Sequence, residues 1–349
     1  MTSTSIRFAE QASAITPTWV RLAELLAAVL FILALKGLSS PKSARRGNLL
    51  GAAGAAIATA VVFFYGQEYY GGPVKHLPQI LGAIAIGSII GWVAARRVQM
   101  TQMPQMVALF NGVGGGAAAV ISVIEFLSVE SESIPILTAT IFTVVVGSVS
   151  FTGSLLTYAK LQELMTSRPV VIPLGRFITI GIAVATIAIA VLLIVNPSNT
   201  LLWLLLGLSL VLGILLVLPV GGADVPIVIS LLNAFTGLSV AASGYVLGNV
   251  LLIVAGTLVG ASGTLLTRMM AKAMGRPLTN TLFGAFTAKA STSAASAEDR
   301  PVKSASPEDV AIMLGYARKV IIVPGYGLAV AQAQNTIREL VELLVAKGI

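Results

Sequence analysis

The sequence predicts a mainly α membrane protein, a bundle of about nine spanning helices followed by the beginning of an α/β domain. Of its 349 residues, 56% are hydrophobic and 10% are charged, whereas soluble domains carry about 25% charged residues. Near the C-terminus, a β-branched run leads through a glycine-rich turn into a helical pattern. A soluble enzyme is excluded as the main interpretation, because too few charged side chains are present to cover its surface.

The rarest residues exclude several chemistries. The chain has no cysteine, which excludes disulfides, zinc–thiolate sites, iron–sulfur clusters and thiol nucleophiles. Its one histidine, His76, excludes a multi-histidine metal centre. We therefore expect no metal site, and we interpret His76 as an exposed loop residue.

Apolar runs divide the first three quarters of the chain. A spanning helix needs about 20 apolar residues, and because the third run is short, we expect its helix to extend into its flanks. The candidate spans are Trp19–Leu38, Leu49–Tyr65, Ile80–Ala95, Met106–Leu127, Ile134–Tyr158, Val170–Val195, Leu201–Pro219, Val225–Leu247 and Val250–Met270.

Basic residues in the short loops predict the orientation. With the N-terminus outside, twelve lysines and arginines lie at inside ends and loops, Lys160 among them, against three outside. We therefore expect an external segment at 1–18, a membrane domain at 19–275 and a cytoplasmic C-terminus. Because the formal charge of +8 is spread over loop edges, it predicts no nucleic-acid partner.

Polar and small residues interrupt several spans. Gly256, Gly260 and Gly263 permit close approach of a neighbouring helix, so the ninth span should pack tightly. Asn111 and Asn233 lie in two other spans, where an amide needs a partner or water. Either these two amides line a shared wet cavity, or each ties two helices together.

Asp224 stands at the start of the eighth span, on the expected cytoplasmic side. One interpretation is an N-cap, in which the carboxylate satisfies free backbone N–H groups. The other is a proton or hydrogen-bond relay at the mouth of a pathway. Its position in the sequence agrees with both.

The C-terminal residues change character. Residues 276–305 are interpreted as a hinge and flexible linker. Ser306 and Pro307 then mark a helix start; the helix runs to about Tyr316. Lys319–Val323 is typical of a buried parallel strand, and a helix with a periodic apolar face follows the glycine turn.

Strand, glycine turn and helix form the context of a Rossmann-like dinucleotide fingerprint. Gly325 permits the tight turn and Gly327 lets the backbone approach a pyrophosphate, while Val330 replaces the third glycine. The helix N-terminus would offer N–H groups to the phosphates. A complete domain needs roughly 100 more residues, so we expect 306–349 to be only the first part of a nucleotide-binding domain.

Together these motifs carry a resemblance to a known family. The chain resembles the beta subunit of proton-translocating NAD(P) transhydrogenase from about Trp19 to its last residue, and the turn Pro-Gly-Tyr-Gly with its continuation is the most specific part. The matching segments are Gln105–Gly112, Gly221–Pro226 with Asn233, Gly260–Gly263 and Pro324–Gln334.

The resemblance implies an enzyme complex in a bacterial inner membrane. It would transfer hydride from NADH to NADP⁺, coupled to protons entering the cytoplasm. NADP(H) would bind this subunit and NAD(H) the partner alpha subunit, in a two-fold assembly of alpha–beta units surrounded by lipid. Direct hydride transfer needs no side-chain nucleophile, so no catalytic side chain is expected. The 349 residues alone should be inactive.

The resemblance also implies roles for individual residues. Asn111 and Asn233 should face the proton path, and Asp224, Ser262 and Arg276 should couple it to the nucleotide domain. Some family members have histidine where this chain has Asn111; asparagine does not titrate, so water or a partner group would carry the proton. The residues expected to wrap the NADP(H) pyrophosphate are Pro324, Gly325, Tyr326, Gly327, Leu328, Ala329, Val330 and Ala331.

Two other functions agree with the same pattern. A secondary transporter or channel subunit with a regulatory dinucleotide-binding domain would also combine spans with a fingerprint, although inverted repeats, which would favour it, are not evident. A purely structural membrane partner with an inactive C-terminal fold is the third.

Overall fold

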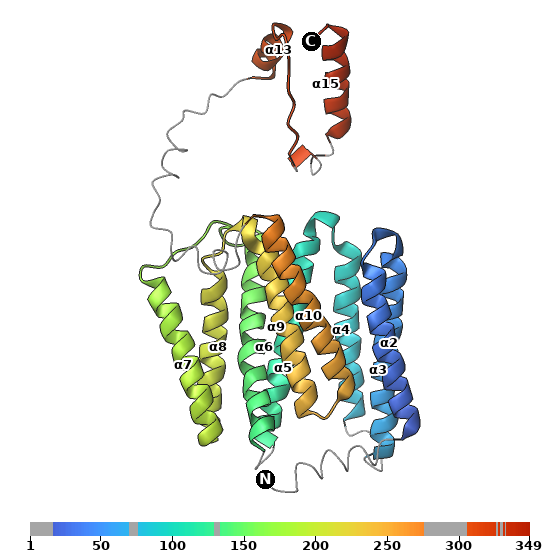
Figure 1. The fold of residues 1–349 in the computed structure, drawn as a ribbon, viewed down its shortest axis with the longest axis vertical. Helices are drawn as coiled ribbons and strands as arrows, with labels where there is room; N and C mark the ends of the chain where they lie inside the picture. Colours follow the sequence, from blue (N-terminus) through green and yellow to red (C-terminus); the bar gives the residue numbers. More distant parts are fainter. Residues whose placement is uncertain are drawn as a thin grey trace. The chain divides into compact units, whose positions relative to one another are not determined.

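The computed structural model describes residues 17–69, 76–128, 133–275, 306–325, 327–328, 331 and 333–349. The chain forms two compact units that divide between Thr287 and Ala288. The first unit is a bundle of long helices, and the described part of the second contains two shorter helices (Figure 1).

Within the described residues, nine helices are long and apolar enough to cross a membrane, which is the number that the sequence predicts. The short third run is extended at both ends and becomes a helix of 21 residues. The chain therefore fits a multi-pass membrane protein. The helices are α2 (Thr18–Leu38), α3 (Pro41–Tyr69), α4 (Leu77–Arg97), α5 (Met103–Ser128), α6 (Ile134–Leu161), α7 (Gly175–Val195), α8 (Asn199–Val217), α9 (Val225–Val246) and α10 (Val250–Ala273).

Helix starts follow local chemistry. Proline occupies one of the first two positions of α4, α6 and α9, where its missing N–H costs nothing and its fixed φ suits a helix. α3 begins at Pro41, eight residues before the predicted Leu49. The polar residues after Pro41 therefore form the first turns of the helix. An apolar run in the sequence cannot predict these turns, because it marks only the part of a helix that lies in lipid.

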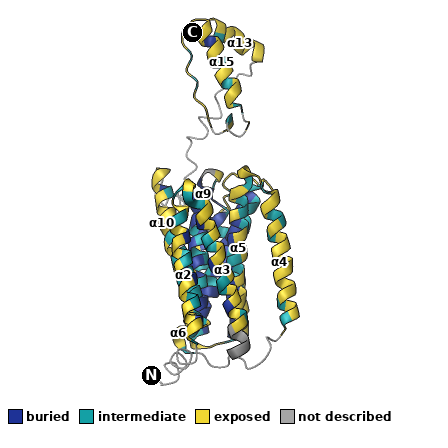
Figure 2. Ribbon diagram, turned by 90° about the vertical axis from the view of Figure 1, so that its right-hand side faces the viewer, coloured by how far each residue is buried: buried dark blue, intermediate teal, exposed yellow. Residues whose placement is uncertain are grey.

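Burial is unequal among the spans. α5, α6 and α9 pack against one another, with α10 on α9 and α8 on α6, and Figure 2 shows the buried residues gathered among them. α4 has no buried residue. The largest apolar core cluster joins α5, α6, α7 and α8 through Val123, Phe126, Leu137, Ile141, Val144, Leu193, Leu202 and Leu205.

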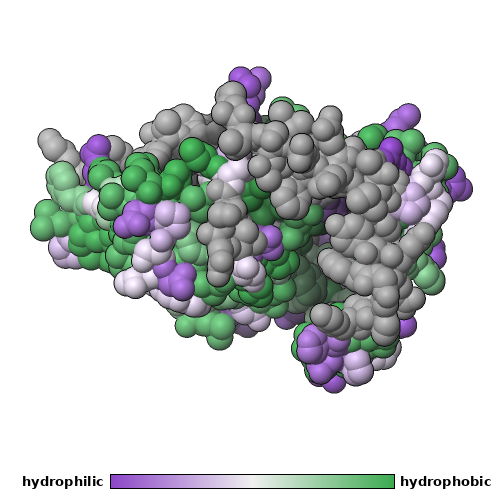
Figure 3. Space-filling view, turned by 90° about the horizontal axis from the view of Figure 1, so that it is seen from below, coloured by the Kyte–Doolittle hydropathy of each residue, from purple (hydrophilic) through white to green (hydrophobic). Residues whose placement is uncertain are grey.

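The outward surface of the bundle is apolar. Many large aliphatic and aromatic side chains are exposed on it, among them Phe64, Ile90, Phe177 and Trp203. In Figure 3, hydrophobic side chains dominate the described surface seen from below, and hydrophilic ones are scattered. A surface of this kind would be a liability in water and suits a lipid environment.

The predicted tight packing of the ninth span is confirmed. Gly256, Gly260 and Gly263 of α10 are buried against α9. A Cβ added to Gly263 would lie 2.9 Å from the Ala234 nitrogen, and one added to Gly237 would collide with the Gly260 nitrogen. This contact, the α9–α10 seam, is close because glycine lets the two backbones approach.

The second unit contains α13 (Pro307–Gly315) and α15 (Gln334–Ala346). The predicted cap is present: Asp309 N donates to Ser306 Oγ at 3.2 Å, and Ser306 N donates to Asp309 Oδ2 at 3.1 Å. Lys319–Val323, predicted as a strand, has no regular secondary structure here. A parallel strand is held by hydrogen bonds to a neighbouring strand, and the described part of this unit contains none.

Candidate functional site

Four polar side chains meet where α5, α6 and α9 pack together. Asn111 Nδ2 donates to Ser154 Oγ at 2.9 Å and to Ser150 Oγ at 3.3 Å. Ser150 Oγ lies 2.6 Å from Thr236 Oγ1 and 2.9 Å from the Leu232 carbonyl oxygen. These contacts join three helices through one hydrogen-bonded group, the polar cluster (Asn111, Ser150, Ser154 and Thr236).

The polar cluster is buried but not saturated. Asn111 is 8% exposed, and its Oδ1 has no hydrogen-bond partner among the described residues. An amide oxygen left dry costs roughly 1–3 kcal/mol in a protein. A site with one unsatisfied acceptor beside several hydroxyls provides the partners that a buried water requires.

Hydroxyl groups continue from the polar cluster along one face of α6. The spacings between successive hydroxyl residues are three, seven, four and three, which keeps them on that face. All five of these residues are buried. Over 17 residues the row covers about 25 Å of helix, most of a bilayer's hydrocarbon thickness. The row comprises Thr140, Thr143, Ser150, Ser154 and Thr157.

Asn233 does not join the polar cluster directly. It lies on α9, half-buried, three residues before Thr236, and its side chain makes no hydrogen bond within the described part of the chain. The two amides thus share the α5–α9 region without bonding to each other. Sequence reasoning missed Ser150, Ser154 and Thr236. The spacing of hydroxyls on the fifth predicted span could have indicated Ser150 and Ser154, whereas Thr236 lies on the eighth span, outside that pattern.

Two of the three expected coupling residues lie in the described part. Asp224 stands at the start of α9, where the sequence places it, and is 9% exposed. Its side chain makes no capping hydrogen bond to the helix, which the N-cap interpretation requires. Ser262 is half-buried on α10, and its Oγ donates to the Val259 carbonyl of its own helix at 3.1 Å. Arg276 lies outside the described residues.

In the second unit, Gly325 and Gly327 of the glycine turn border open space in the described part of the chain. Leu328 N donates to the Gly325 carbonyl at 3.1 Å, and Ala331 N to the Gly327 carbonyl at 2.9 Å, so the turn winds into a helical conformation. A Cβ added to Gly325 or Gly327 would meet no atom of the described residues within 4 Å. Both glycines thus leave space that a pyrophosphate can fill. Pro324 is exposed, whereas Tyr326, Ala329 and Val330 lie outside the described residues.

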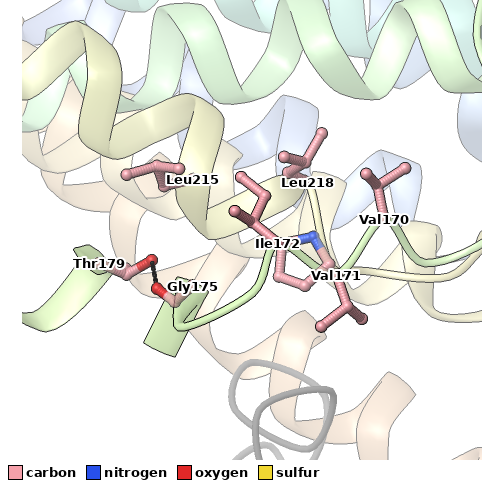
Figure 4. A pocket seen from close by; sticks show the side chains of 8 residues that line it. Val170, Val171, Ile172, Gly175, Thr179, Leu215 and Leu218 are labelled. Atoms are coloured by element: carbon pink, nitrogen blue, oxygen red, sulfur yellow. Dashed lines mark hydrogen bonds between the residues drawn. The ribbon is translucent and has the colours of Figure 1, made fainter. Parts of the chain in front are cut away.

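A small apolar hollow lies elsewhere, between α7 and the end of α8 (Figure 4). Its one polar side chain is Thr179, whose Oγ1 donates to the Gly175 carbonyl of its own helix at 2.9 Å. It therefore offers no group for polar recognition. It is lined by Val170, Val171, Ile172, Gly175, Thr179, Leu215, Leu218 and Pro219.

Comparisons with known proteins agree with the geometry. The family model described as NAD(P) transhydrogenase beta subunit matches residues 20–349. NAD(P) transhydrogenase subunit beta of Rhodospirillum rubrum, and the protein of that name from one strain of this species, are each 40% identical over 337 residues, covering 94% of this chain and 71% of the relative. These matches do not favour a transporter or channel subunit. The chain belongs to the family of NAD(P) transhydrogenase beta subunits and is one subunit of that oxidoreductase complex.

Proposed function

We propose that this chain binds NADP(H) and conducts protons, so that hydride transfer from NADH to NADP⁺ is coupled to proton movement across the membrane. NAD(H) is held by the partner alpha subunit. Support comes from the family match, from the polar cluster inside the bundle and from the open glycine turn. The complex is a two-fold assembly of alpha–beta units.

The observation that carries the proposal is the unsatisfied Oδ1 of Asn111 beside buried hydroxyls. Polar groups inside a membrane bundle are costly and tend to line pathways. Asparagine does not titrate, so the protein's part is to hold water: Asn111 accepts a hydrogen bond from it, and Ser150 and Thr236 continue the chain. Water in this chain, or a titratable group of the alpha subunit, carries the proton.

Asn233 extends this path, and Asp224, Ser262 and Arg276 connect it to the nucleotide domain. The protein lies in a bacterial inner membrane with the N-terminus outside and the C-terminus in the cytoplasm, as the distribution of basic residues supports. Asp224 then stands at the cytoplasmic mouth. Because NADP(H) state changes the accessibility of the path, the two sites are linked reciprocally.

In the nucleotide domain, Gly325 and Gly327 let the backbone approach the NADP(H) pyrophosphate, and Pro324 to Ala331 wrap it. When bound, NADP(H) supplies the hydride chemistry. The residues of this chain orient the cofactor and exclude water, which is all that direct hydride transfer demands of a protein.

Asn111→Leu in the whole complex is the direct test. The chain is co-expressed with an alpha subunit and the rest of the nucleotide-binding domain, and sealed vesicles are assayed for hydride transfer with and without an uncoupler. We expect the coupled component to fall about tenfold or more. Thr138→Leu is the matched control, because Thr138 is exposed on α6 and bonds only to its own helix.

The same assay on the wild-type complex can contradict the proposal. If it transfers hydride at a rate that no uncoupler changes, the chain conducts no protons and the proposal fails. Asn111→His introduces a titratable group at the same site and should give a coupled rate that depends on pH near neutrality.

A further inference from the structure

Lys160, counted from the sequence among the loop-edge charges, is in fact buried. It lies one residue before the end of α6 and is 1% exposed. Its Nζ donates to three backbone carbonyl oxygens: Val217 at 3.0 Å, Leu218 at 2.5 Å and Val220 at 2.7 Å. All three ammonium protons therefore have acceptors at one place, the end of α8 and the turn after it.

This arrangement has a clear physical basis. The last carbonyls of a helix have no intrahelical partner, and the C-terminal end carries partial negative charge. An ammonium is costly to bury unless it is well hydrogen-bonded. Lysine suits this site because its three donors point in different directions, whereas the donors of arginine lie in one plane. Lys160 thus ties the end of α8 to the end of α6.

The turn that Lys160 holds leads directly to Asp224. Gly222 N donates to the Ser167 carbonyl at 2.9 Å, and Ser167 Oγ donates back to the Lys160 carbonyl at 3.4 Å. Asp224 N then donates to the Gly221 carbonyl at 2.9 Å, immediately before α9. A continuous set of contacts runs from Lys160 to the start of α9.

We propose that Lys160 is a positioning residue for proton coupling: it fixes residues 217–224 and thereby holds Asp224 in place at the end of the bundle. This inference rests on the proposed function, in which Asp224 couples the membrane path to the nucleotide domain. Among the described residues, Lys160 Nζ hydrogen-bonds to the three carbonyls of this turn and not to the polar cluster. Its effect on the reaction passes through the turn.

The test compares four variants of the complete alpha–beta complex in sealed vesicles. The readout is the uncoupler-sensitive share of hydride transfer for each assembled complex, so a loss of protein alone does not change it. We expect Lys160→Met and Asp224→Asn each to lower this share about fivefold or more. The double variant should be no worse than Asp224→Asn, because one residue acts through the other. Lys42→Met is the control; Lys42 is exposed at the start of α3.

Lys160→Arg covers the case in which Lys160→Met does not assemble. It keeps the charge but cannot reach three divergent carbonyls, so it should assemble with a reduced coupled share. Normal coupling in the Lys160 variants, with Asp224→Asn impaired, overturns the inference and leaves the proposed function standing. A double variant with additive losses also overturns it. Normal coupling in Asp224→Asn overturns the role of Asp224 itself.

Discussion

In the α9–α10 seam, a methyl group added to Gly237, Gly256 or Gly263 would press against the opposite backbone. In the turn after Val323, by contrast, a methyl group at Gly325 or Gly327 would meet no atom of the described residues within 4 Å. In the seam, glycine is required by the chain's own packing. In the turn, nothing in the described chain requires it. The openness of the turn glycines is compatible with the proposed binding of a dinucleotide, and it is a property that they share with other glycines, such as Gly181 and Gly315.

A second contrast, among the spans, shows where polarity is tolerated. α7 has the highest mean hydropathy, 2.9, with 17% of its window buried, whereas α9 has a value of 1.9 with 56% buried. Lipid accepts only the apolar side chains, so hydroxyls and amides collect on the helices that face one another. The polar cluster lies in this buried set, which is the placement that a path through the bundle requires.

Gly237→Leu should have the largest effect. It drives a side chain into the backbone of α10, and overpacking costs about 1–3 kcal/mol or more. We expect loss of folded complex, measured by unfolding in mixed detergent. Gly181→Leu on α7 is the matched control, because a Cβ there meets nothing within 4 Å. Equal stability of the two variants would contradict the prediction that a glycine packed in the seam tolerates a side chain less well than an open glycine.

Gly327→Ala should weaken NADP(H) binding without destabilising the fold. The added methyl group meets no atom of the described chain, so we expect the thermal stability of the complex to stay unchanged. In the proposed function, the methyl group would occupy space that the pyrophosphate fills. We expect NADP(H) affinity to fall about tenfold, equivalent to about 1.4 kcal/mol, in a fluorescence titration. Gly315→Ala, also open, is the control. Unchanged NADP(H) affinity together with lower thermal stability would show that Gly327 serves the packing of the chain and not the cofactor.

Much of the bundle could be predicted from the sequence, because apolar length alone identifies a spanning helix. The nine spans, the tight packing of α10 and the position of Asp224 are confirmed. The partners of Asn111 could not be predicted. Serine and threonine in a spanning helix often bond their own carbonyls, as Thr157 does with Gly153 at 2.7 Å, so a hydroxyl in the sequence does not reveal which neighbour it meets.

Lys160 and the predicted strand show the other limit. A lysine at a helix end is usually solvated, and only the position of α8 reveals that Lys160 is covered by three carbonyls. Lys319–Val323 has the composition of a strand, yet a strand exists only beside another. Both features depend on residues distant in sequence, which local patterns do not encode.

Ser230→Ala should have the smallest effect and tests what holds the seam. Ser230 Oγ donates to the Gly263 carbonyl at 3.1 Å and accepts from Thr267 Oγ1 at 3.0 Å. Thr267 Oγ1 also lies 2.7 Å from the Gly263 carbonyl oxygen, so in the variant its one hydroxyl proton is donated there and no group is left without a partner. Interhelical hydrogen bonds in membranes average about 0.6 kcal/mol, and we expect a loss of that order in the detergent assay that measures Gly237→Leu.

Ser128→Ala, which removes an exposed bond within α5, should cost less. If Ser230→Ala destabilises the complex as much as Gly237→Leu, hydrogen bonds hold the seam together, and the close packing of the glycines is a consequence of those hydrogen bonds.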